Sequence, residues 1–248
     1  TEGLKPGDRV VAACGRTLAE RVAAKASLVL PAPRNLGFEA AAGICITYPT
    51  TMHALEQRAQ LQPGETLLVL GAAGGVGTTA VELGRHMGAT VIAAAGTDEK
   101  LELARSLGAV HLVNYATQDL RERIKEITRG KGVDVVYDPV GGALAEPALR
   151  SMAWNGRYLV IGFAGGEIPR IPLNLPLLKG CSIVGVYWGS FASREPEAQR
   201  QNVAALWELF EAGKLTPVVG ETHEFGDFAA AFEALRARRA FGKVVVRI

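Results

Sequence analysis

Short apolar runs and helical segments alternate along the chain from residue 66 onward. The runs are nearly continuous rather than interleaved with polar residues, as expected of strands buried on both faces. We predict strands over residues 66–70, 90–94, 111–113, 133–137, 157–162 and 182–186, whose starts lie about 20 to 25 residues apart, the length of one βα unit. Because strands and helices alternate strictly, the pattern indicates an α/β fold, a doubly wound parallel sheet with helices on both faces.

The segments between these strands have helical period. The first apolar stripe consists of Val76, Ala80, Leu83 and Met87, and the second of Leu101, Ala104 and Leu107. Gly88 and Gly108 are placed to end these two helices, and Thr97 or Asp98 is a suitable N-cap for the second. Two more helices are predicted over residues 119–128 and 143–152.

The two ends of the chain differ from this central block. Residues 1 to about 38 contain isolated apolar runs that end at prolines, and we interpret them as separate strands. From about residue 190 we predict an amphipathic helix that includes Leu206 and Phe210, a short strand, a helix over 227–239 and a last strand over 243–248. The two ends therefore form a second unit that flanks the α/β domain.

The composition of the chain argues against several classes of function. The chain has 248 residues, 48% of them hydrophobic, with 27 Lys and Arg against 25 Asp and Glu. A net charge of +2 is too small for the cationic field of most nucleic-acid-binding proteins, and no apolar run is long enough to cross a bilayer. Cys14, Cys45 and Cys181 are odd in number and far apart, so no disulfide framework is indicated. We expect a cytoplasmic protein whose partner is a small molecule.

One motif in the sequence indicates a ligand-binding site. The strand at 66–70 runs into Gly71-Ala72-Ala73-Gly74-Gly75-Val76-Gly77, and a helix follows at once. Such a turn lets the backbone approach a pyrophosphate at the helix N-terminus. In the G-x-G-x-x-G pattern of dinucleotide-binding proteins, Ala72 stands at the first position, with Gly74 and Gly77 at the others. We favour a dinucleotide site, and the alternative is a turn that serves only tight packing.

The end of the second strand bears on which dinucleotide binds. An NAD site usually has an acidic residue there, whereas this strand ends in Gly96-Thr97. Lys100 can pair with a 2′-phosphate and Tyr115 can donate its phenol, although a solvated lysine and a packed loop aromatic are the simpler interpretations. Asp98 and Glu99 argue for NAD, but acidic residues are favoured in any first helical turn. We therefore predict NADP(H).

The chain resembles the zinc-free quinone oxidoreductases of the medium-chain dehydrogenase/reductase superfamily, which include zeta-crystallin. The matching segments are Gly7-Asp8-Arg9-Val10, Tyr48-Pro49-Thr50-Thr51-Met52-His53-Ala54-Leu55, Leu61-Gln62-Pro63-Gly64-Glu65, Gly71 to Gly77, Gly96-Thr97-Asp98-Glu99-Lys100, Val113-Asn114-Tyr115, Val133 to Gly142 and Gly242-Lys243-Val244-Val245. They span nearly the whole chain. Gly71 replaces the alanine of the family's A-x-x-G-x-x-G motif, and Thr51-Met52 stands where many relatives have Ala-Tyr, which alters the expected pocket near the nicotinamide.

The resemblance implies a cofactor site. The pyrophosphate contacts fall on Ala73, Gly74, Gly75, Val76 and Gly77, and the 2′-phosphate contacts on Gly96, Thr97, Lys100 and Tyr115. The residues that line the nicotinamide and its ribose correspond to Thr50, Gly162, Phe163, Ala164, Tyr187 and Lys243. Phe163 and Tyr187, taken alone, would be interpreted as core aromatics. No catalytic side chain is assigned.

The resemblance also implies a domain organisation. Residues 1–43 would be the C-terminal part of a GroES-like, mainly β catalytic domain, residues 44–188 the NADP-binding Rossmann domain, and residues 189–248 the return to the catalytic domain. Family members carry a substantial stretch before the segment that matches Gly7, so we expect that this sequence is a fragment or that its N-terminal part lies outside it. The family pairs its last sheet strand across a two-fold axis, which predicts a homodimer through residues 182–186.

Other chemistries find little support. Cys14 and Cys45 lie near positions where zinc-dependent relatives have ligands, but Cys14 has no second cysteine nearby, and we interpret His53 as a helix-surface residue. We predict no metal and treat all three cysteines as buried apolar thiols. No Tyr-x-x-x-Lys pair and no Gly-x-Ser-x-Gly elbow occurs.

We expect an NADPH-dependent oxidoreductase that passes hydride to a quinone or a similar conjugated carbonyl compound. Such transfer needs mainly proximity and orientation, so the lack of an obvious acid/base pair does not count against it. One alternative is reduction of an activated C=C bond in an enone or enoyl thioester, and another is a non-catalytic NADPH-binding protein. The residues alone do not distinguish among these three.

Overall fold

The computed structural model describes residues 3–248. The chain forms two compact units. We call Thr50–Gln199 the sheet unit, and the residues up to Pro49 together with Arg200–Ile248 the flanking unit. The boundaries fall inside two helices, α1 (Phe38–Met52) and α8 (Pro196–Glu211).

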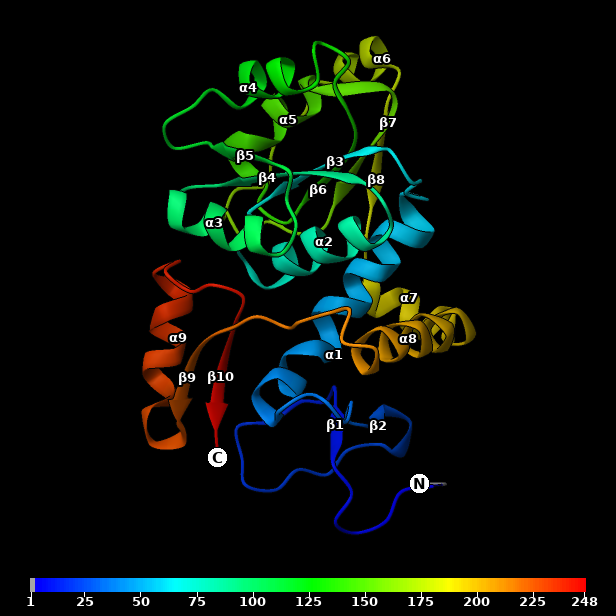
Figure 1. Cartoon of the computed structure of the whole chain (residues 1–248), viewed down its shortest axis with the longest axis vertical. Coiled ribbons are helices and arrows are strands. Elements are labelled where there is room, and N and C mark those ends of the chain that lie inside the picture. Colours follow the sequence, from blue (N-terminus) through cyan, green and yellow to red (C-terminus); the bar gives the residue numbers. More distant parts are fainter. Residues whose placement is uncertain (1–2) are drawn as a thin grey trace. The chain divides into compact units, whose positions relative to one another are not determined.

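The sheet unit is built on a six-stranded parallel sheet (Figure 1). Its strands are β3 (Thr66–Leu70), β4 (Thr90–Ala95), β5 (His111–Asn114), β6 (Val133–Asp138), β7 (Met152–Val160) and β8 (Ser182–Gly185), in the order β5-β4-β3-β6-β7-β8. The chain winds outward in one direction from β3 to β5 and then in the other from β6 to β8. The carboxyl ends of β3 and β6 therefore meet where the winding reverses, which is where open α/β sheets bind ligands.

Helices cover both faces of this sheet, as the sequence pattern predicts. α2 (Gly75–His86) and α3 (Asp98–Ser106) pack on one face, and α4 (Leu120–Ile127) and α5 (Ala145–Arg150) on the other (Figure 1). The side chains of Leu67 and Leu68, neighbours on β3, point to opposite faces of the sheet, and both are fully buried. Burial on both faces explains the continuous apolar run. The predicted α/β class is confirmed.

Strand β7 differs most from its predicted bounds. It begins at Met152 instead of residue 157, and helix α5 ends at Arg150 instead of reaching residue 152. The cause is a bulge in the pairing with β6, at which Asn155 has a φ of 62°. Asn-Gly is normally a turn signal, so the sequence pattern places a break where the strand continues.

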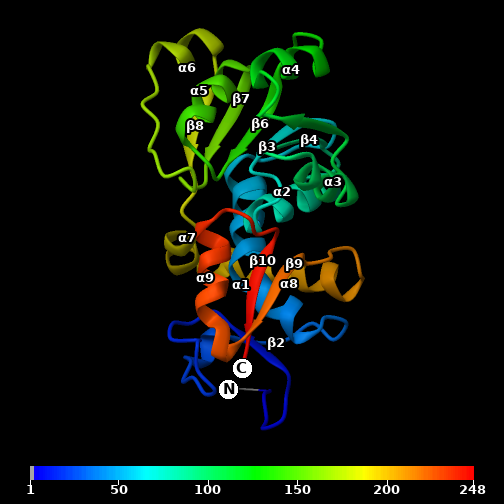
Figure 2. The ribbon, with the colours of Figure 1, turned by 90° about the vertical axis from the view of Figure 1, so that its left-hand side faces the viewer.

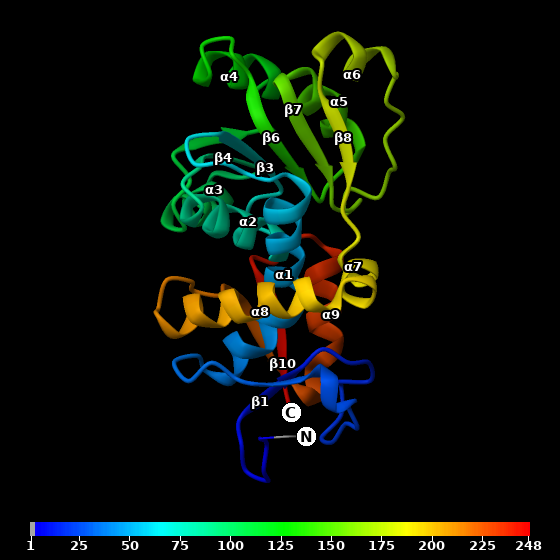
Figure 3. The same ribbon diagram turned by 90° about the vertical axis from the view of Figure 1, so that its right-hand side faces the viewer.

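Two short helices of the sheet unit have no clear signal in the sequence. α6 (Asn174–Lys179) precedes β8, and α7 (Trp188–Arg194) follows it. β8 lies at the edge of the sheet, and among residues 3–248 it pairs with β7 alone (Figure 3).

The flanking unit has two small two-stranded ladders. β1 (Val10–Ala12) pairs antiparallel with β2 (Val29–Pro31), and β9 (Val219–Glu224) pairs parallel with β10 (Lys243–Arg247). α9 (Phe228–Arg236) packs along the second pair (Figure 2). The predicted isolated strands, the helix over 227–239 and the last strand are thus confirmed, with shorter bounds.

Helix α1 was not predicted. Pro49 lies inside it, and the helix continues as a π-helix, η2 (His53–Arg58). Proline disfavours a helix interior, so the sequence reads as a break here. In the flanking unit, the ring of Tyr48 on α1 meets that of Phe210 on α8 at 4.9 Å between centroids, where the two helices cross (Figure 3).

The remaining short elements are 3-10 helices: η1 (Ala26–Leu28), η3 (Gly142–Leu144) and η4 (Phe225–Asp227). Within residues 3–248, no helix combines the length and apolar character that a membrane span requires. The three cysteines are partly exposed, so their assignment as buried thiols was wrong.

Candidate nucleotide-binding site

The turn between β3 and α2 forms the centre of the site. Gly71 has a φ of 58°, and Gly74 is the N-cap of α2. A Cβ atom on Gly77 would overlap the carbonyl oxygen of Gly71 and lie 2.9 Å from the carbonyl carbon of Ala72. Only glycine lets the first turn of the helix approach the end of the strand this closely.

This turn leaves donors available for an anion. The first hydrogen bond of α2 runs from the amide of Thr78 to the carbonyl of Gly74, at 2.9 Å. The amides of Gly75, Val76 and Gly77 precede that bond and have no acceptor within the helix. The first turn carries no acidic side chain. The predicted residues at 73–77 thus form a positive helix end suited to a phosphate group.

A second part of the site lies where β4 ends. A Cβ atom on Gly96 would lie 3.3 Å from the ring of Tyr115, which follows β5. Thr97 caps α3, accepting a hydrogen bond from the amide of Lys100 at 3.3 Å, and so places Lys100 in the first turn. The structure therefore brings Gly96, Thr97, Lys100 and Tyr115 to one edge of the sheet.

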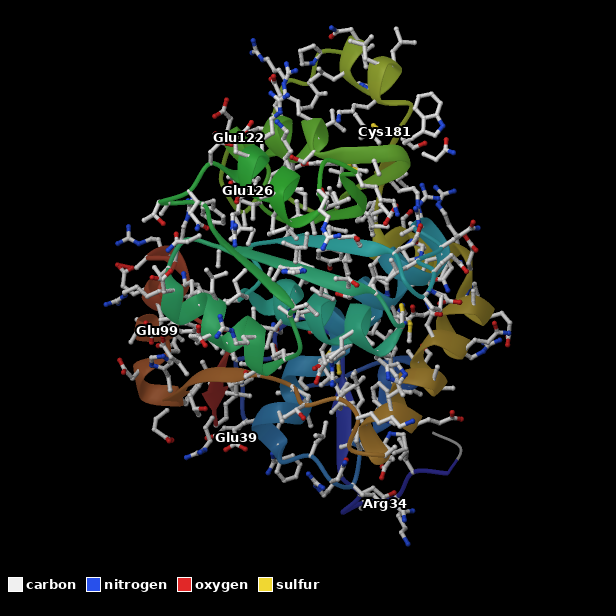
Figure 4. The ribbon with its side chains drawn as sticks, turned by 45° about the horizontal axis from the view of Figure 1, so that its top comes forward. Arg34, Glu39, Glu99, Glu122, Glu126 and Cys181 are labelled. Atoms are coloured by element: carbon white, nitrogen blue, oxygen red, sulfur yellow. The ribbon has the colours of Figure 1, made fainter. Side chains whose placement is uncertain are left out.

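Asn114, at the end of β5, also lies at this edge, and the sequence alone assigns it no role. Its side chain is buried, and its Nδ2 donates to Oδ1 of Asp98 at 2.7 Å. Asp98 is therefore tied to the end of β5 by a structural bond. Glu99, the other acid of this turn, is exposed on α3 (Figure 4).

Asp138 organises the loop at the end of β6. Its Oδ1 accepts hydrogen bonds from the amides of Val140 and Gly141 at 2.7 and 2.8 Å, and its Oδ2 accepts one from the hydroxyl of Tyr158. Burial, together with the charge of Asp138, raises the pKa of Tyr158 far above its ordinary value of 10.0. The phenol therefore stays protonated and holds the carboxylate in place.

The loop after β7 packs on this same loop. The amide of Ala164 donates to the carbonyl of Pro139 at 3.0 Å, and that of Gly162 to the carbonyl of Asp138 at 3.3 Å. Side chains at 139 and 140 in turn lie beside Gly71: a Cβ atom there would be 2.8 Å from Cγ2 of Val140. The predicted residues 162–164 are therefore connected to the glycine turn through the β6 loop.

The predicted aromatic residues are exposed. Phe163 is 40% exposed and Tyr187, at the start of α7, is 78% exposed. Their alternative interpretation as core aromatics was therefore wrong. Thr50 is half-buried on α1, at the first position of the sheet unit.

Lys243 belongs to the flanking unit. It begins β10, and its Cγ would lie 3.1 Å from a Cβ atom on Gly43 of α1. Burial lowers the pKa of Lys243, and burial raises the pKa of Cys45 to about 11. Both residues line a cleft of about 840 Å³ within this unit.

The residues discussed as zinc ligands are Cys14, Cys45 and His53. Among residues 3–248, no group of three or more His, Cys, Asp and Glu side chains is arranged to hold a metal ion. His53 was predicted to lie on a helix surface, which was wrong: it is 5% exposed. Its ring stacks on Phe191 of α7 at 3.8 Å between centroids, and its Nδ1 lies 3.2 Å from Oε1 of Gln57.

Known proteins resemble this chain in sequence and in fold. The family model described as zinc-binding dehydrogenase matches residues 75–209. Quinone oxidoreductase-like protein 2 of Bos taurus is 37% identical over 247 residues, which cover 99% of this chain and 71% of that protein. The chain belongs to the quinone oxidoreductase-like family of the medium-chain dehydrogenase/reductase superfamily. This confirms the resemblance found in the sequence.

Two other members of the superfamily bear on function. The quinone oxidoreductase of Thermus thermophilus, whose structures include a complex with NADPH, has a TM-score of 0.87 and 37% identity, and the match covers 99% of this chain and 79% of that one. The 2-haloacrylate reductase of a Burkholderia species is 33% identical over 225 residues, 89% of this chain and 67% of that protein.

The residues of the sheet unit fit a dinucleotide. The glycine turn provides the close approach and the free amides that a pyrophosphate needs, and a side chain on Gly77 would abolish both. Lys100 brings a positive charge to the edge that also holds Gly96 and Tyr115, at the end of the second strand of the unit, where this fold binds the ribose of a dinucleotide.

Proposed function

We propose that this chain is an NADPH-dependent oxidoreductase that transfers a hydride to a quinone or a similarly conjugated carbonyl compound without a zinc ion. We also propose the domain assignment made from the sequence, with residues 44–188 as the Rossmann domain and residues 1–43 and 189–248 as parts of a GroES-like domain. The observation that carries the proposal is the glycine turn at the N-terminus of α2, closed on β3 with three amides directed away from the helix.

The 2′-phosphate preference is supported by the edge at β4 and β5. Gly96 stands where an acidic residue would bind the ribose hydroxyls of NAD, and Asp98 has an oxygen engaged by Asn114. Lys100 supplies a positive charge in the first turn of α3. These features favour NADPH over NADH.

Hydride transfer is supported by what the residues near the carboxyl ends of β6 and β7 can do. When bound, NADPH supplies the hydride from its nicotinamide ring. Hydrogen bonds to the carboxylate of Asp138 hold the loop after β6 in place, and backbone hydrogen bonds join residues 162–164 to that loop. The ring of Phe163 is therefore carried by a rigid backbone. Orientation of two flat rings needs such rigid, partly apolar surfaces more than it needs an acid or base.

A second candidate is reduction of an activated C=C bond. The observation that favours it is the 33% identity with a protein named 2-haloacrylate reductase. The same cofactor and the same rigid loops would serve, with hydride delivered to the β carbon and a proton taken from water. Reduction of a quinone remains the first proposal, because the more similar relatives are named as quinone oxidoreductases or as proteins like them.

The test compares cofactors and acceptors. Oxidation of NADPH and NADH is followed through the absorbance of the reduced nicotinamide, first with phenanthrenequinone and then with an α,β-unsaturated ketone. We expect fast oxidation of NADPH with the quinone and little of NADH. Lys100→Ala should reduce that preference, whereas Lys125→Ala, which removes a lysine from α4 far along the chain, should leave it unchanged.

Other results would change the proposal in defined ways. Turnover of the ketone but not the quinone would favour the second candidate. A preference for NADH would contradict the 2′-phosphate assignment, and tight NADPH binding without turnover of either acceptor would indicate a binding protein.

We further propose a homodimer through β8. The outer edge of β8 is unpaired within residues 3–248, and apolar side chains of β8 and of the α6 segment that precedes it are exposed: Leu173, Leu177, Leu178 and Ile183. Such an edge is prone to pair with another strand, and a two-fold axis would cover it with a second copy.

Light scattering after gel filtration tests the dimer. We expect a dimer mass for the wild type and a monomer mass after Leu177→Glu with Leu178→Glu. Val110→Glu, at an exposed apolar position next to β5, is the matched control and should remain a dimer. A monomeric wild type would contradict the proposal.

A further inference from the structure

Three hydroxyl groups meet in the interior of the sheet unit, and no part of the site above uses them. They belong to Thr51 on α1, Thr79 on α2 and Tyr137 on β6, each at most 2% exposed. Oγ1 of Thr51 lies 2.7 Å from Oγ1 of Thr79 and 2.9 Å from the hydroxyl oxygen of Tyr137. Oγ1 of Thr79 also donates to the carbonyl of Val76 at 2.9 Å.

Proton counting gives this network one direction. A carbonyl oxygen can only accept, so Thr79 uses its single hydroxyl proton on Val76. Thr79 must then accept from Thr51, and Thr51, having used its own proton, must accept from Tyr137. The chain of donors therefore runs from Tyr137 through Thr51 and Thr79 to the Val76 carbonyl. Burial raises the pKa of Tyr137 far above 10.0, so the first donor keeps its proton.

Each of these residues stands next to a part of the nucleotide site. Thr51 follows Thr50, Tyr137 precedes Asp138 with its loop cradle, and Thr79 is bonded to Val76 in the amide-bearing first turn of α2. The three elements are joined by side chains at their site-facing ends, in addition to their packing against each other.

The chemistry of the network argues for a positional role. A buried hydroxyl costs free energy unless it is hydrogen-bonded, and apolar side chains of similar size would fill the space without that requirement. Hydrogen bonds, unlike apolar contacts, fix both distance and direction. Three buried hydroxyls with complete partners therefore hold α1, α2 and β6 in one register.

We propose that Thr51 is a positioning residue for the cofactor, which sets the first turn of α2 through Thr79 and aligns that turn with the end of β6 through Tyr137. This inference rests on the proposed function, since the group positioned is the binding site for NADPH. Thr51 does not touch the cofactor itself, because its side chain is fully buried.

The direct test is NADPH binding by Thr51→Val. Valine keeps the shape, removes the donor to Thr79 and leaves Tyr137 without its acceptor. We expect the Kd for NADPH, measured by titration calorimetry, to rise by about tenfold, the equivalent of one or two hydrogen bonds. The KM for NADPH should rise by a similar factor, with a smaller change in kcat. Thr51→Ser, which keeps the hydroxyl, should restore the affinity.

Thr47→Val is the matched control. Thr47 is a buried threonine one turn earlier on α1, and its hydroxyl donates to the carbonyl of Gly43 in the same helix at 3.0 Å. Its loss should lower the melting temperature without changing the Kd for NADPH, because the bond links no second element.

A double-mutant cycle tests whether Tyr137 and Thr51 act on the cofactor site as one network. If they do, the effects of Tyr137→Phe and Thr51→Val on the Kd must be less than additive. Tyr137→Phe also serves if Thr51→Val fails to fold.

The outcomes separate this role from the proposed function. If the wild type binds NADPH and both Thr51→Val and Tyr137→Phe bind it equally well, the network only stabilises the fold and the inference is wrong. If Thr51→Val lowers the affinity no more than Thr47→Val, the inference is also wrong. If the wild type itself does not bind NADPH, the proposed function fails first, and the positional role fails with it.

Discussion

The two units use parallel strands in different ways. In the sheet unit, β3 and β4 have helices on both faces, and the interior residues of these strands are fully buried. In the flanking unit, β9 and β10 also pair in parallel, but β9 alternates between exposed and half-buried residues. Helix α9 beside them exposes Phe228, Phe232 and Leu235.

This difference indicates what each unit can contribute to a site. Strand ends that are buried on both faces hold the backbone rigidly, so the sheet unit can present amides as binding groups, as at Gly75 to Gly77. The flanking unit has little such support and presents side chains instead, such as Lys243 at its cleft. Substitutions matched between the two units should therefore differ in their effects.

The largest effect is expected from Gly77→Ala. The new methyl group would overlap backbone atoms of Gly71 and Ala72, which cannot move without separating α2 from β3. We expect loss of about 3 kcal/mol or more of unfolding free energy and loss of NADPH binding. Urea denaturation and calorimetric titration measure the two effects.

Gly226→Ala in the flanking unit is the matched control. A Cβ atom there has no neighbour within 4 Å, and the φ of Gly226 is not in the left-handed region. Its stability and its NADPH binding should equal those of the wild type. Equal effects of the two substitutions would contradict the contrast between the units.

A smaller effect is expected from Glu65→Gln in the sheet unit. Glu65 forms two hydrogen bonds with the guanidinium of Arg157, at 2.7 and 2.6 Å, and both side chains are about one-fifth exposed. Although burial raises the pKa of Glu65, the bonds from Arg157 and from the amide of Gln62 lower it below its ordinary 4.5. We expect a loss of about 1–3 kcal/mol at pH 7.

The pH dependence has a defined sign. Because the pKa of Glu65 is lowered in the folded state, its contribution is complete above about pH 4.5 and is lost as the pH falls below that value. The matched variant is Glu233→Gln, which removes an exposed ion pair with Arg236 in the flanking unit. Solvent screens that pair, so the melting temperature of Glu233→Gln should equal that of the wild type at each pH.

The smallest effect is expected at His53. Burial lowers its pKa below 6.5, despite the bond to Gln57. The unfolded chain therefore binds the proton more strongly, so the stabilisation is complete above pH 6.5 and declines as the pH falls. His53→Phe keeps the stack on Phe191 and should flatten the decline in melting temperature between about pH 7 and 5.

Much of the sheet unit was predictable because its signals are local. The apolar runs at 66–70 and 90–94 predict buried strands without knowledge of their partners, and the glycines at 71, 74 and 77 predict a close strand-to-helix turn. Helix α1 was missed because Pro49 within it carries the opposite local signal. Strand β7 was cut short for the same reason, by Asn155 and Gly156.

The residues of the candidate site likewise fall into two groups, those with a local signal in the sequence and those without one. Gly74, Gly77 and Gly96 were singled out from the sequence, because glycine at the end of a strand is informative wherever the strand goes, and their role in binding stays a prediction. Asp138, Asn114 and Thr51 were not assigned roles, although each is buried and bonded. Nothing in their spacing distinguishes them from ordinary polar residues.

The alternation of strands and helices, the glycine turn and the family could be read from the amino-acid sequence, since these depend on residue types at neighbouring positions. Which distant polar groups meet follows from the tertiary fold. The partners of Asp138 and Thr51 lie 20 and 86 positions away. Tyr158 reaches Asp138 because β7 pairs with β6, whereas the bond between Tyr137 and Thr51 joins β6 to helix α1. Burial periodicity encodes which face of an element is covered, but the register of one element against another follows from the packing of the whole unit.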